Sequence, residues 1–93
     1  MNVEDVFSSK LRMKILKALY DIGELNVSDF ARRLGVNYAS ANKHLKVLEH
    51  EGILQRKMFG RICMYRYNDQ SAKARIVQSL IEVWEKEAER NRR

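Results

Sequence analysis

The segment ELNVSDFARRLGVNYASANKHLKVLEHEGIL, residues 24–54, constrains the fold of this chain more than any other part of it. Its apolar spacing predicts a short helix over Val27–Leu34, a tight turn at Gly35 and a second helix over Tyr38–His50. The turn needs a residue that tolerates a left-handed backbone, as glycine does. Two helices joined in this way form a helix-turn-helix, here over about residues 27–50. The second helix of such a unit is the usual reader of a DNA major groove.

A longer helix is predicted before this unit, beginning at about Val3 or Ser9 and ending at Ile22. Apolar side chains recur at helical spacing along one face of it, at Leu11, Ile15, Ala18, Leu19 and Ile22. A second apolar stripe lies roughly opposite, at Met13, Leu16 and Tyr20. A helix that is apolar on two sides needs two partners. We expect one partner to be the protein's own core and the other to be a second subunit.

Two strand-like runs follow the second motif helix, over about residues 53–59 and 61–67. They are rich in β-branched and aromatic residues, and Gly60 lies between them, where a reversal of the chain permits positive φ. The runs therefore predict a β-hairpin, with basic residues at Arg56, Lys57, Arg61 and Arg66. A hairpin packed directly after a recognition helix is called a wing.

The C-terminal part predicts a long amphipathic helix over about residues 71–89, capped at Asn68-Asp69. About 20 residues of helix reach roughly 30 Å, the width of a small domain. We expect this helix, the dimerisation helix of about residues 70–90, to pair with the first helix and with its own copy. The predicted interface residues are Leu16, Tyr20, Ile76, Leu80, Val83 and Trp84.

Together these elements predict a single domain over residues 1–93, mainly α with a small β-hairpin (α+β). Its arrangement is a winged helix-turn-helix whose N- and C-terminal helices form a dimer interface. A chain this short buries only about 60–65% of its unfolded surface, and a dimer would supply further burial. No apolar run approaches the roughly 20 residues of a membrane span, and no signal peptide is visible. With one cysteine, the chain has no internal disulfide and fits a reducing cytoplasm.

The net charge of +6 is concentrated in one region of the chain. Residues 32–75 carry ten Lys or Arg and three acidic residues, whereas the segments on either side are nearly neutral. This surplus coincides with the helix-turn-helix and the hairpin, as expected of a protein that binds the phosphate backbone. The alternative is that the charge only keeps a small protein soluble.

Ten residues are predicted to contact DNA. On the second motif helix, asparagine can pair with adenine, lysine can reach guanine or phosphate, and alanine can meet a thymine methyl. Arginines at the end of the first motif helix and cations beside the hairpin turn suit phosphate or the minor groove. The set is Arg32, Arg33, Tyr38, Ala39, Ser40, Asn42, Lys43, Lys46, Lys57 and Arg61. An ordinary solvated surface is the alternative interpretation of each.

Four segments in order and register resemble the winged-helix regulators of the ArsR (arsenic-repressor-like) type. SKLRMKILKAL resembles the opening helix of that family, and GELNVSDFARRLGV resembles its "GEL-V-L-A-LG" segment. ASANKHLKVLEHEGIL is similar to the stretch that carries the recognition helix, and FGRICMYRY to the returning strand of the wing. The resemblance covers about two thirds of the chain and implies a homodimeric DNA-binding regulator.

Two departures from that family's pattern bear on metal binding. Metal sensors of this type often carry a cysteine pair in the segment that matches ELNVSDF, where this chain has Asn26 and Ser28. Neither side chain supplies the soft thiolate that such metals require. The family's alternative sensor site uses Asp, His and Glu on the C-terminal helix, and residues 71–93 contain glutamates but no histidine. Carboxylates without imidazole or thiolate rarely hold a transition metal, so we expect no metal and no cofactor.

Two hypotheses about function follow. The first is a homodimeric, sequence-specific regulator of transcription, a repressor, that binds double-stranded DNA. The second is a protein-interaction module built on a winged helix, since fold alone does not assign function. The sequence shows no nucleophile–base pair, metal-ligand cluster or phosphate-binding loop, so we do not expect an enzyme. For His44, contact with DNA and bracing of the helix both remain open, and Cys63 is interpreted as a small buried hydrophobe.

Overall fold

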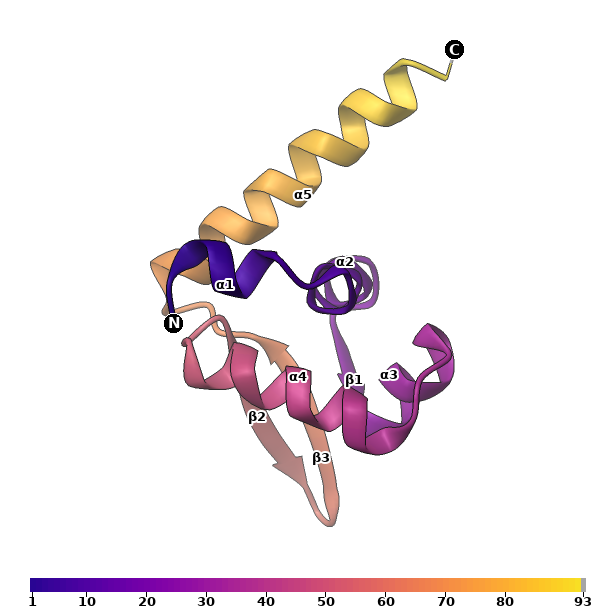
Figure 1. The fold of residues 1–93 in the computed structure, drawn as a ribbon, viewed down its shortest axis with the longest axis vertical. Coiled ribbons are helices and arrows are strands. Elements are labelled where there is room, and N and C mark those ends of the chain that lie inside the picture. Colours follow the sequence, from indigo (N-terminus) through magenta and orange to yellow (C-terminus); the bar gives the residue numbers. More distant parts are fainter. Residues whose placement is uncertain (93) are drawn as a thin grey trace.

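The computed structural model describes residues 1–92 and shows a mainly helical protein with a small antiparallel sheet (Figure 1). This confirms the predicted winged helix-turn-helix of the α+β class. The elements in chain order are α1 (Val3–Phe7), α2 (Lys10–Ile22), β1 (Glu24–Asn26), α3 (Val27–Leu34), α4 (Tyr38–His50), β2 (Leu54–Phe59), β3 (Ile62–Tyr67) and α5 (Ala72–Arg90).

The helix-turn-helix has the predicted bounds, and local capping explains them. Asn37 caps α4, because its Oδ1 accepts a hydrogen bond from the backbone N–H of Ser40 at 2.7 Å. Gly35 ends α3 in the left-handed conformation, with φ 67° and ψ 34°, and its N–H donates to the carbonyl of Ala31. Both helix ends at the turn are therefore satisfied by residues within the turn itself.

The sheet contains one strand more than the predicted hairpin. Residues 24–26, which lie between the two predicted helices, form β1 and pair antiparallel with β3, so the strand order is β1-β3-β2. The hairpin itself is confirmed, with Leu54 opposite Tyr67 and Phe59 opposite Ile62. Ile53 was predicted to begin the first strand but lies outside β2. Its N–H donates to the carbonyl of Leu48, and this hydrogen bond closes the end of α4.

Of the two predicted starts of the first helix, the one at Ser9 is confirmed: α2 follows Ser9 and ends at Ile22, whereas the residues from Val3 form a separate helix, α1. Ser9 caps α2, since its Oγ accepts from the backbone N–H of Arg12 at 3.1 Å. Ser8 turns back to α1, and its hydroxyl donates to the carbonyl of Asp5. Two serines with competing side-chain hydrogen bonds thus separate what the apolar spacing alone would join.

Helix α2 lies between α5 on one side and the helix-turn-helix and sheet on the other (Figure 1). Its two apolar stripes do have two partners, but both belong to the same chain. Placing Leu16 in the dimer interface was therefore wrong, because Leu16 has no exposed surface. Its carbonyl accepts a buried hydrogen bond from the Tyr67 hydroxyl, and Tyr20 packs half-buried against the same core.

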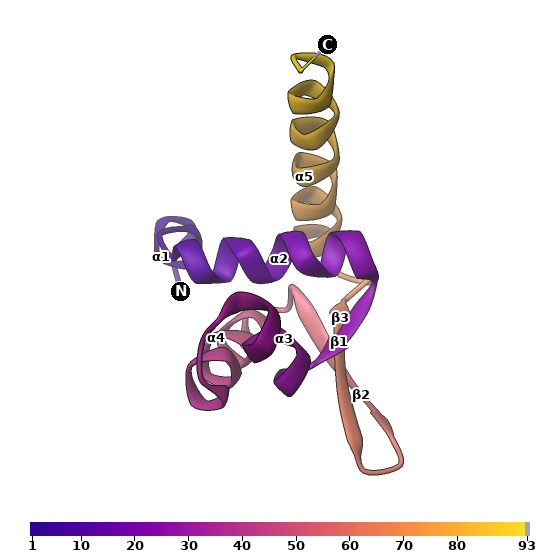
Figure 2. The same cartoon turned by 90° about the vertical axis from the view of Figure 1, so that its right-hand side faces the viewer.

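Helix α5 agrees with the predicted helix over about residues 71–89, but its cap is Ser71 and not Asn68-Asp69, because the Ser71 hydroxyl accepts from the N–H of Ala74. Asn68 instead donates from its side chain to the Gly52 carbonyl. The helix buries Ala74, Val77 and Ile81 and then extends away from the body, opposite to the β2–β3 hairpin (Figure 2). Among residues 1–92, none of the helices has the length and apolarity that crossing a membrane requires.

Candidate nucleic-acid interface

Helix α4 presents a basic face on the side opposite its buried residues. Ala41, Leu45 and Leu48 are fully buried against the core. At 3.6 residues per turn, Ala39, Lys43, Lys46 and His50 lie on the opposite side, and all four are exposed. This stripe is the centre of the candidate interface.

The other predicted α4 residues lie on the two flanks of this stripe. Tyr38 is exposed and lies at the start of the helix, on the flank that carries Asn42 and Glu49. Asn42 and Ser40 are half-buried, and the N–H of Ser40 is engaged by the cap. His50 was predicted only as the last residue of the helix and not as a DNA contact. Its position four residues after Lys46 places it on the same face, and this spacing is visible in the sequence.

The Arg12 side chain braces α4 from behind through His44. Arg12 is only 9% exposed, and its Nε donates to the carbonyl of Val6 at 2.9 Å, while Nη2 donates to that of Asp5 at 2.6 Å. Its Nη1 lies 3.0 Å from Nδ1 of His44. A guanidinium can only donate, so Nδ1 of His44 is the acceptor and the ring proton is on Nε2.

Burial, followed by the charges of Arg12 and Lys43, lowers the pKa of His44. The imidazole is therefore neutral at pH 7, as the hydrogen bond from Arg12 requires. Of the two roles left open for His44, the structure shows the brace.

The arginines at the end of α3 differ in their surroundings. Arg32 forms an ion pair with Asp29 one turn earlier on the same helix. Arg33 is exposed and borders a hollow between α2 and α3 together with Lys14 and Lys17. The structure therefore places Arg33 beside α2 and not on the α4 stripe.

The wing continues the positive surface next to α4. Arg56 Nε lies 2.7 Å from Oε2 of Glu49, so the hairpin and the recognition helix are joined by an ion pair. Lys57 and Arg61 are exposed near the hairpin turn, as predicted. The ammonium of Lys57 lies 5.6 Å from the centre of the Phe59 ring.

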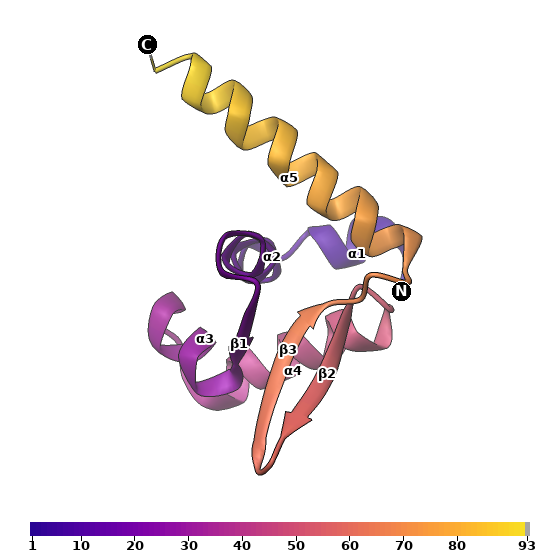
Figure 3. The ribbon, with the colours of Figure 1, turned by 180° about the vertical axis from the view of Figure 1, so that it is seen from behind.

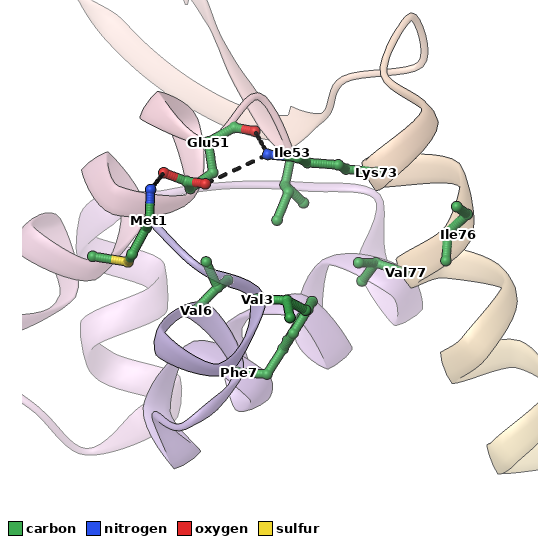
Figure 4. A pocket seen from close by; sticks show the side chains of 9 residues that line it. All are labelled: Met1, Val3, Val6, Phe7, Glu51, Ile53, Lys73, Ile76 and Val77. Atoms are coloured by element: carbon green, nitrogen blue, oxygen red, sulfur yellow. Dashed lines mark hydrogen bonds and ion pairs between the residues drawn. The ribbon is translucent and has the colours of Figure 1, made fainter.

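A hollow of about 270 Å³ opens between α1, α5 and the end of α4 (Figure 4). Its walls are mostly apolar, from Val6, Phe7 and Val77 among others. The Glu51 carboxylate contacts the amine of Met1 at 3.1 Å and the Lys73 ammonium at 3.4 Å, and these contacts lower its pKa. The charged groups at this hollow already pair with one another.

The remaining predicted interface residues form an exposed apolar face on α5. Ile76, Leu80, Val83 and Trp84 are between 50% and 71% exposed. Leu80 and Trp84 also border a hollow between α2 and α5, at whose rim Lys17 and Glu85 form an ion pair of 2.9 Å. Within residues 1–92, half or more of each of these four side chains remains uncovered.

Potential metal ligands are scattered. In the part of the chain that the structure describes, no group of three or more His, Cys, Asp or Glu side chains could hold a metal ion. Asn26 is the N-cap of α3, because its Oδ1 accepts a hydrogen bond from the backbone N–H of Asp29 at 2.8 Å. Cys63 is half-buried on β3 and packs against the core.

A helix-turn-helix followed by a packed hairpin defines the class of winged helix-turn-helix proteins. The model of the family described as "Bacterial regulatory protein, arsR family" matches residues 9–56, and the chain belongs to that family. This confirms the resemblance stated above.

Two curated relatives match most of the chain. One is the uncharacterized HTH-type transcriptional regulator YdgJ of Bacillus subtilis, 32% identical over 88% of this chain and 48% of its own length. The other is a cadmium resistance transcriptional regulatory protein, the CadC homolog of Staphylococcus aureus, 31% identical over 87% of this chain and 69% of its own. The chain thus spans about half the length of the first relative.

Solved structures show the same fold. The winged helix-turn-helix domain of Mb0332 from Mycobacterium bovis is described as homodimeric and DNA-binding. It superposes with a TM-score of 0.74 at 25% identity, covering 91% of this chain and 76% of that one. The repressor BigR from Xylella fastidiosa superposes with a TM-score of 0.75 at 22% identity over 85% of this chain and 76% of its own, a likeness of fold alone.

Proposed function

We propose that this protein is a sequence-specific regulator of transcription, a repressor, that binds double-stranded DNA as a homodimer. The observation that carries the proposal is the exposed stripe of Ala39, Lys43, Lys46 and His50 on α4, beside a hairpin without acidic residues. Helix α4 would enter the major groove, and Lys57 and Arg61 would contact the adjacent minor groove or its phosphates. The names of the relatives as transcriptional regulators support this assignment.

Dimerisation is part of the proposal because a winged helix reads two half-sites through two-fold symmetry. The exposed face of Ile76, Leu80, Val83 and Trp84 is the surface that a second copy would cover. Half-sites about one helical turn apart are then expected. The homodimeric Mb0332 domain supports this arrangement.

The proposal includes no catalysis and no metal requirement. The relative from Staphylococcus aureus is named for cadmium resistance. Here Asn26 and Ser28 stand where the family's cysteine pair is expected, and neither side chain supplies a thiolate. We therefore expect DNA affinity to be the same with a chelator and with added Cd²⁺ or Zn²⁺.

The test begins with selection of bound duplexes from random DNA and continues with titration of the recovered duplex at increasing salt. We expect the logarithm of the association constant to fall linearly with the logarithm of salt concentration, by about 0.9 per phosphate contact. Lys43→Gln combined with Lys46→Gln should flatten this slope by about 1.8 and weaken binding. Lys86→Gln on α5, which removes a lysine paired with Glu82, is the matched control and should change neither.

The second candidate function is a protein-interaction module on the same scaffold. The two candidates differ in how binding responds to neutralising Lys43 and Lys46, because a protein partner does not require the lysines of α4. Recovery of no duplex by the wild-type protein, or binding that hardly changes with salt, would favour this module and contradict the regulator.

A further inference from the structure

The tip of the wing is apolar, although the rest of the hairpin is basic. Met58, Phe59 and Ile62 are 59%, 48% and 54% exposed. The hairpin extends beyond the body of the protein, so its tip lies far from α2 and α5 (Figures 2 and 3). Three large apolar side chains therefore stand in water at the outermost point of the sheet.

The strand register shows why the chain itself does not cover this tip. Phe59 is paired with Ile62 directly across the hairpin, next to the turn. Strand β1, the other neighbour of β3, reaches only as far as the pair Asn26 and Met64. The buried side chains of the sheet, among them Tyr65 and Tyr67, lie nearer its base. The Phe59–Ile62 pair is thus beyond both the third strand and the core.

The charges around the tip indicate the kind of partner that would cover it. Residues 53–67 contain four arginines or lysines and no acidic residue. Lys57 stands over the Phe59 ring, and Arg61 is exposed in the turn between Phe59 and Ile62. Cations on either side of an apolar tip complement a partner that carries phosphates at its edges and apolar base faces that become accessible when a base step is opened, as duplex DNA does.

Only side chains at the turn would enter a minor groove, because that groove is about 6 Å wide in B-form DNA and too narrow for a two-stranded ribbon. Phe59 and Ile62 form the last cross-strand pair before the turn, so they are the side chains in position to do so. Proteins that bend DNA insert phenylalanine, isoleucine or methionine side chains from the minor groove between base steps.

We propose that Phe59 and Ile62 form an apolar wedge that enters the minor groove, partly unstacks one base step and bends the duplex. Lys57 and Arg61 hold the phosphates on either side of the wedge. This inference rests on the proposed DNA-binding function and adds to it a mode of recognition. The favoured step is a flexible pyrimidine–purine step, because such steps unstack at the least cost.

The experiment uses the duplex recovered in the selection, labelled at its ends for energy transfer and carrying 2-aminopurine at successive flexible steps. Wild-type protein should bend the duplex by at least about 20° and raise 2-aminopurine fluorescence at one step in each half-site. The double variant Phe59→Ser and Ile62→Thr should lose both signals and bind about tenfold more weakly, roughly 1.4 kcal/mol. Phe59→Leu keeps an apolar tip and should keep most of the bend.

Two controls separate the wedge from other effects. Ile22→Thr removes an isoleucine that is 42% exposed at the end of α2, just before β1 and not at the tip of the wing, and should leave bending unchanged. Lys57→Gln should weaken binding at low salt but leave the bent complex bent once it is saturated.

The possible outcomes are distinct. If the double variant binds and bends DNA as the wild type does, the wedge is refuted while the regulator stands. If the wild-type protein recovers no duplex, the regulator itself fails and the wedge with it. If the tip variants change only self-association in gel filtration, the tip contacts a second copy of the chain, and the wedge is again refuted.

Discussion

Arg12 and His44 are 32 residues apart in sequence and are joined by a hydrogen bond of 3.0 Å between Nη1 and Nδ1. The same guanidinium holds the carbonyls of Asp5 and Val6. One buried cation thus connects the end of α1 to the recognition helix. The contact requires a neutral imidazole, because a protonated ring would present an N–H to another donor.

This contact makes stability depend on pH in a specific direction. The pKa of His44 is lowered in the folded protein from its ordinary value of 6.5, so the unfolded chain takes up the proton first as pH falls. The part of the unfolding free energy that depends on neutral His44 is therefore fully present above pH 6.5, and it is lost as the pH falls through the lowered pKa. His44→Gln, whose amide oxygen can still accept from Arg12, should show a smaller loss in urea unfolding between pH 7 and pH 5. His50→Gln should keep the wild-type loss, and an identical pH profile for His44→Gln would contradict the assignment.

The ion pair between Glu49 and Arg56 predicts a variant that binds DNA more tightly than the wild type. Glu49→Gln removes a carboxylate beside the proposed interface and releases Arg56 for phosphate. We expect affinity to rise about threefold, roughly 0.7 kcal/mol, and the salt slope to steepen by up to about 0.9. Glu82→Gln makes the same charge change on α5, where Glu82 pairs with Lys86, and should leave the affinity unchanged. Equal gains in both variants would indicate a long-range charge effect instead.

Trp84 would report on formation of the proposed dimer, because it is the single tryptophan and is 71% exposed. Burial by a second copy should shift its emission to shorter wavelength as protein concentration rises. Leu80→Glu places a charge on the same face and should weaken the dimer by at least about tenfold, or 1.4 kcal/mol. Its emission should then stay at long wavelength, in agreement with a monomer mass in sedimentation. Ile22→Glu, away from this face, should behave as the wild type; loss of the dimer in both variants would argue against the α5 face.

Substitution of Gly35 is expected to destabilise the protein for conformational reasons alone. Its φ of 67° is left-handed, yet a Cβ built on it meets no atom within 4 Å. Gly35→Ala should therefore cost about 1–2 kcal/mol from backbone strain and not from a clash. For a domain of this size, each kcal/mol lowers the melting temperature by about 4–8 °C in calorimetry. Gly35→Asn should cost less, since asparagine tolerates this region better; equal losses would point to an effect other than strain.

The parts of the fold that local chemistry decides could be predicted from the sequence. The bounds of α3 and α4 follow from side-chain caps and a glycine a few residues away, and these signals do not depend on the rest of the chain. The placement of Leu16 and the third strand β1 could not be predicted in this way. Each depends on which distant element packs beside it: α2 is covered on both sides, and β1 is a strand only because β3 is there.

The candidate site divides in the same manner. Lys43 and Lys46 could be placed on the outer face from helical spacing alone, and the hairpin cations from their position beside Gly60. The Arg12–His44 contact could not, because it joins residues from two elements whose relative position only the tertiary structure sets. The apolar residues on either side of Gly60 predicted two strands, but the exposure of Phe59 and Ile62 depends on the register, which places them beyond the end of β1.

Asn26 belongs at once to β1, where it pairs with Met64 beside the wing, and to α3, whose first turn it caps. The sheet that carries the wing and the helix that leads into the turn before α4 therefore share a residue, with no flexible linker between them. A protein built in this way has little freedom to adjust the distance between α4 and the wing, its two proposed contacts with a duplex. A rigid protein imposes its own curvature on the DNA, and sequences differ in how easily they bend. The flexibility of the duplex would therefore contribute to which sequences the protein prefers.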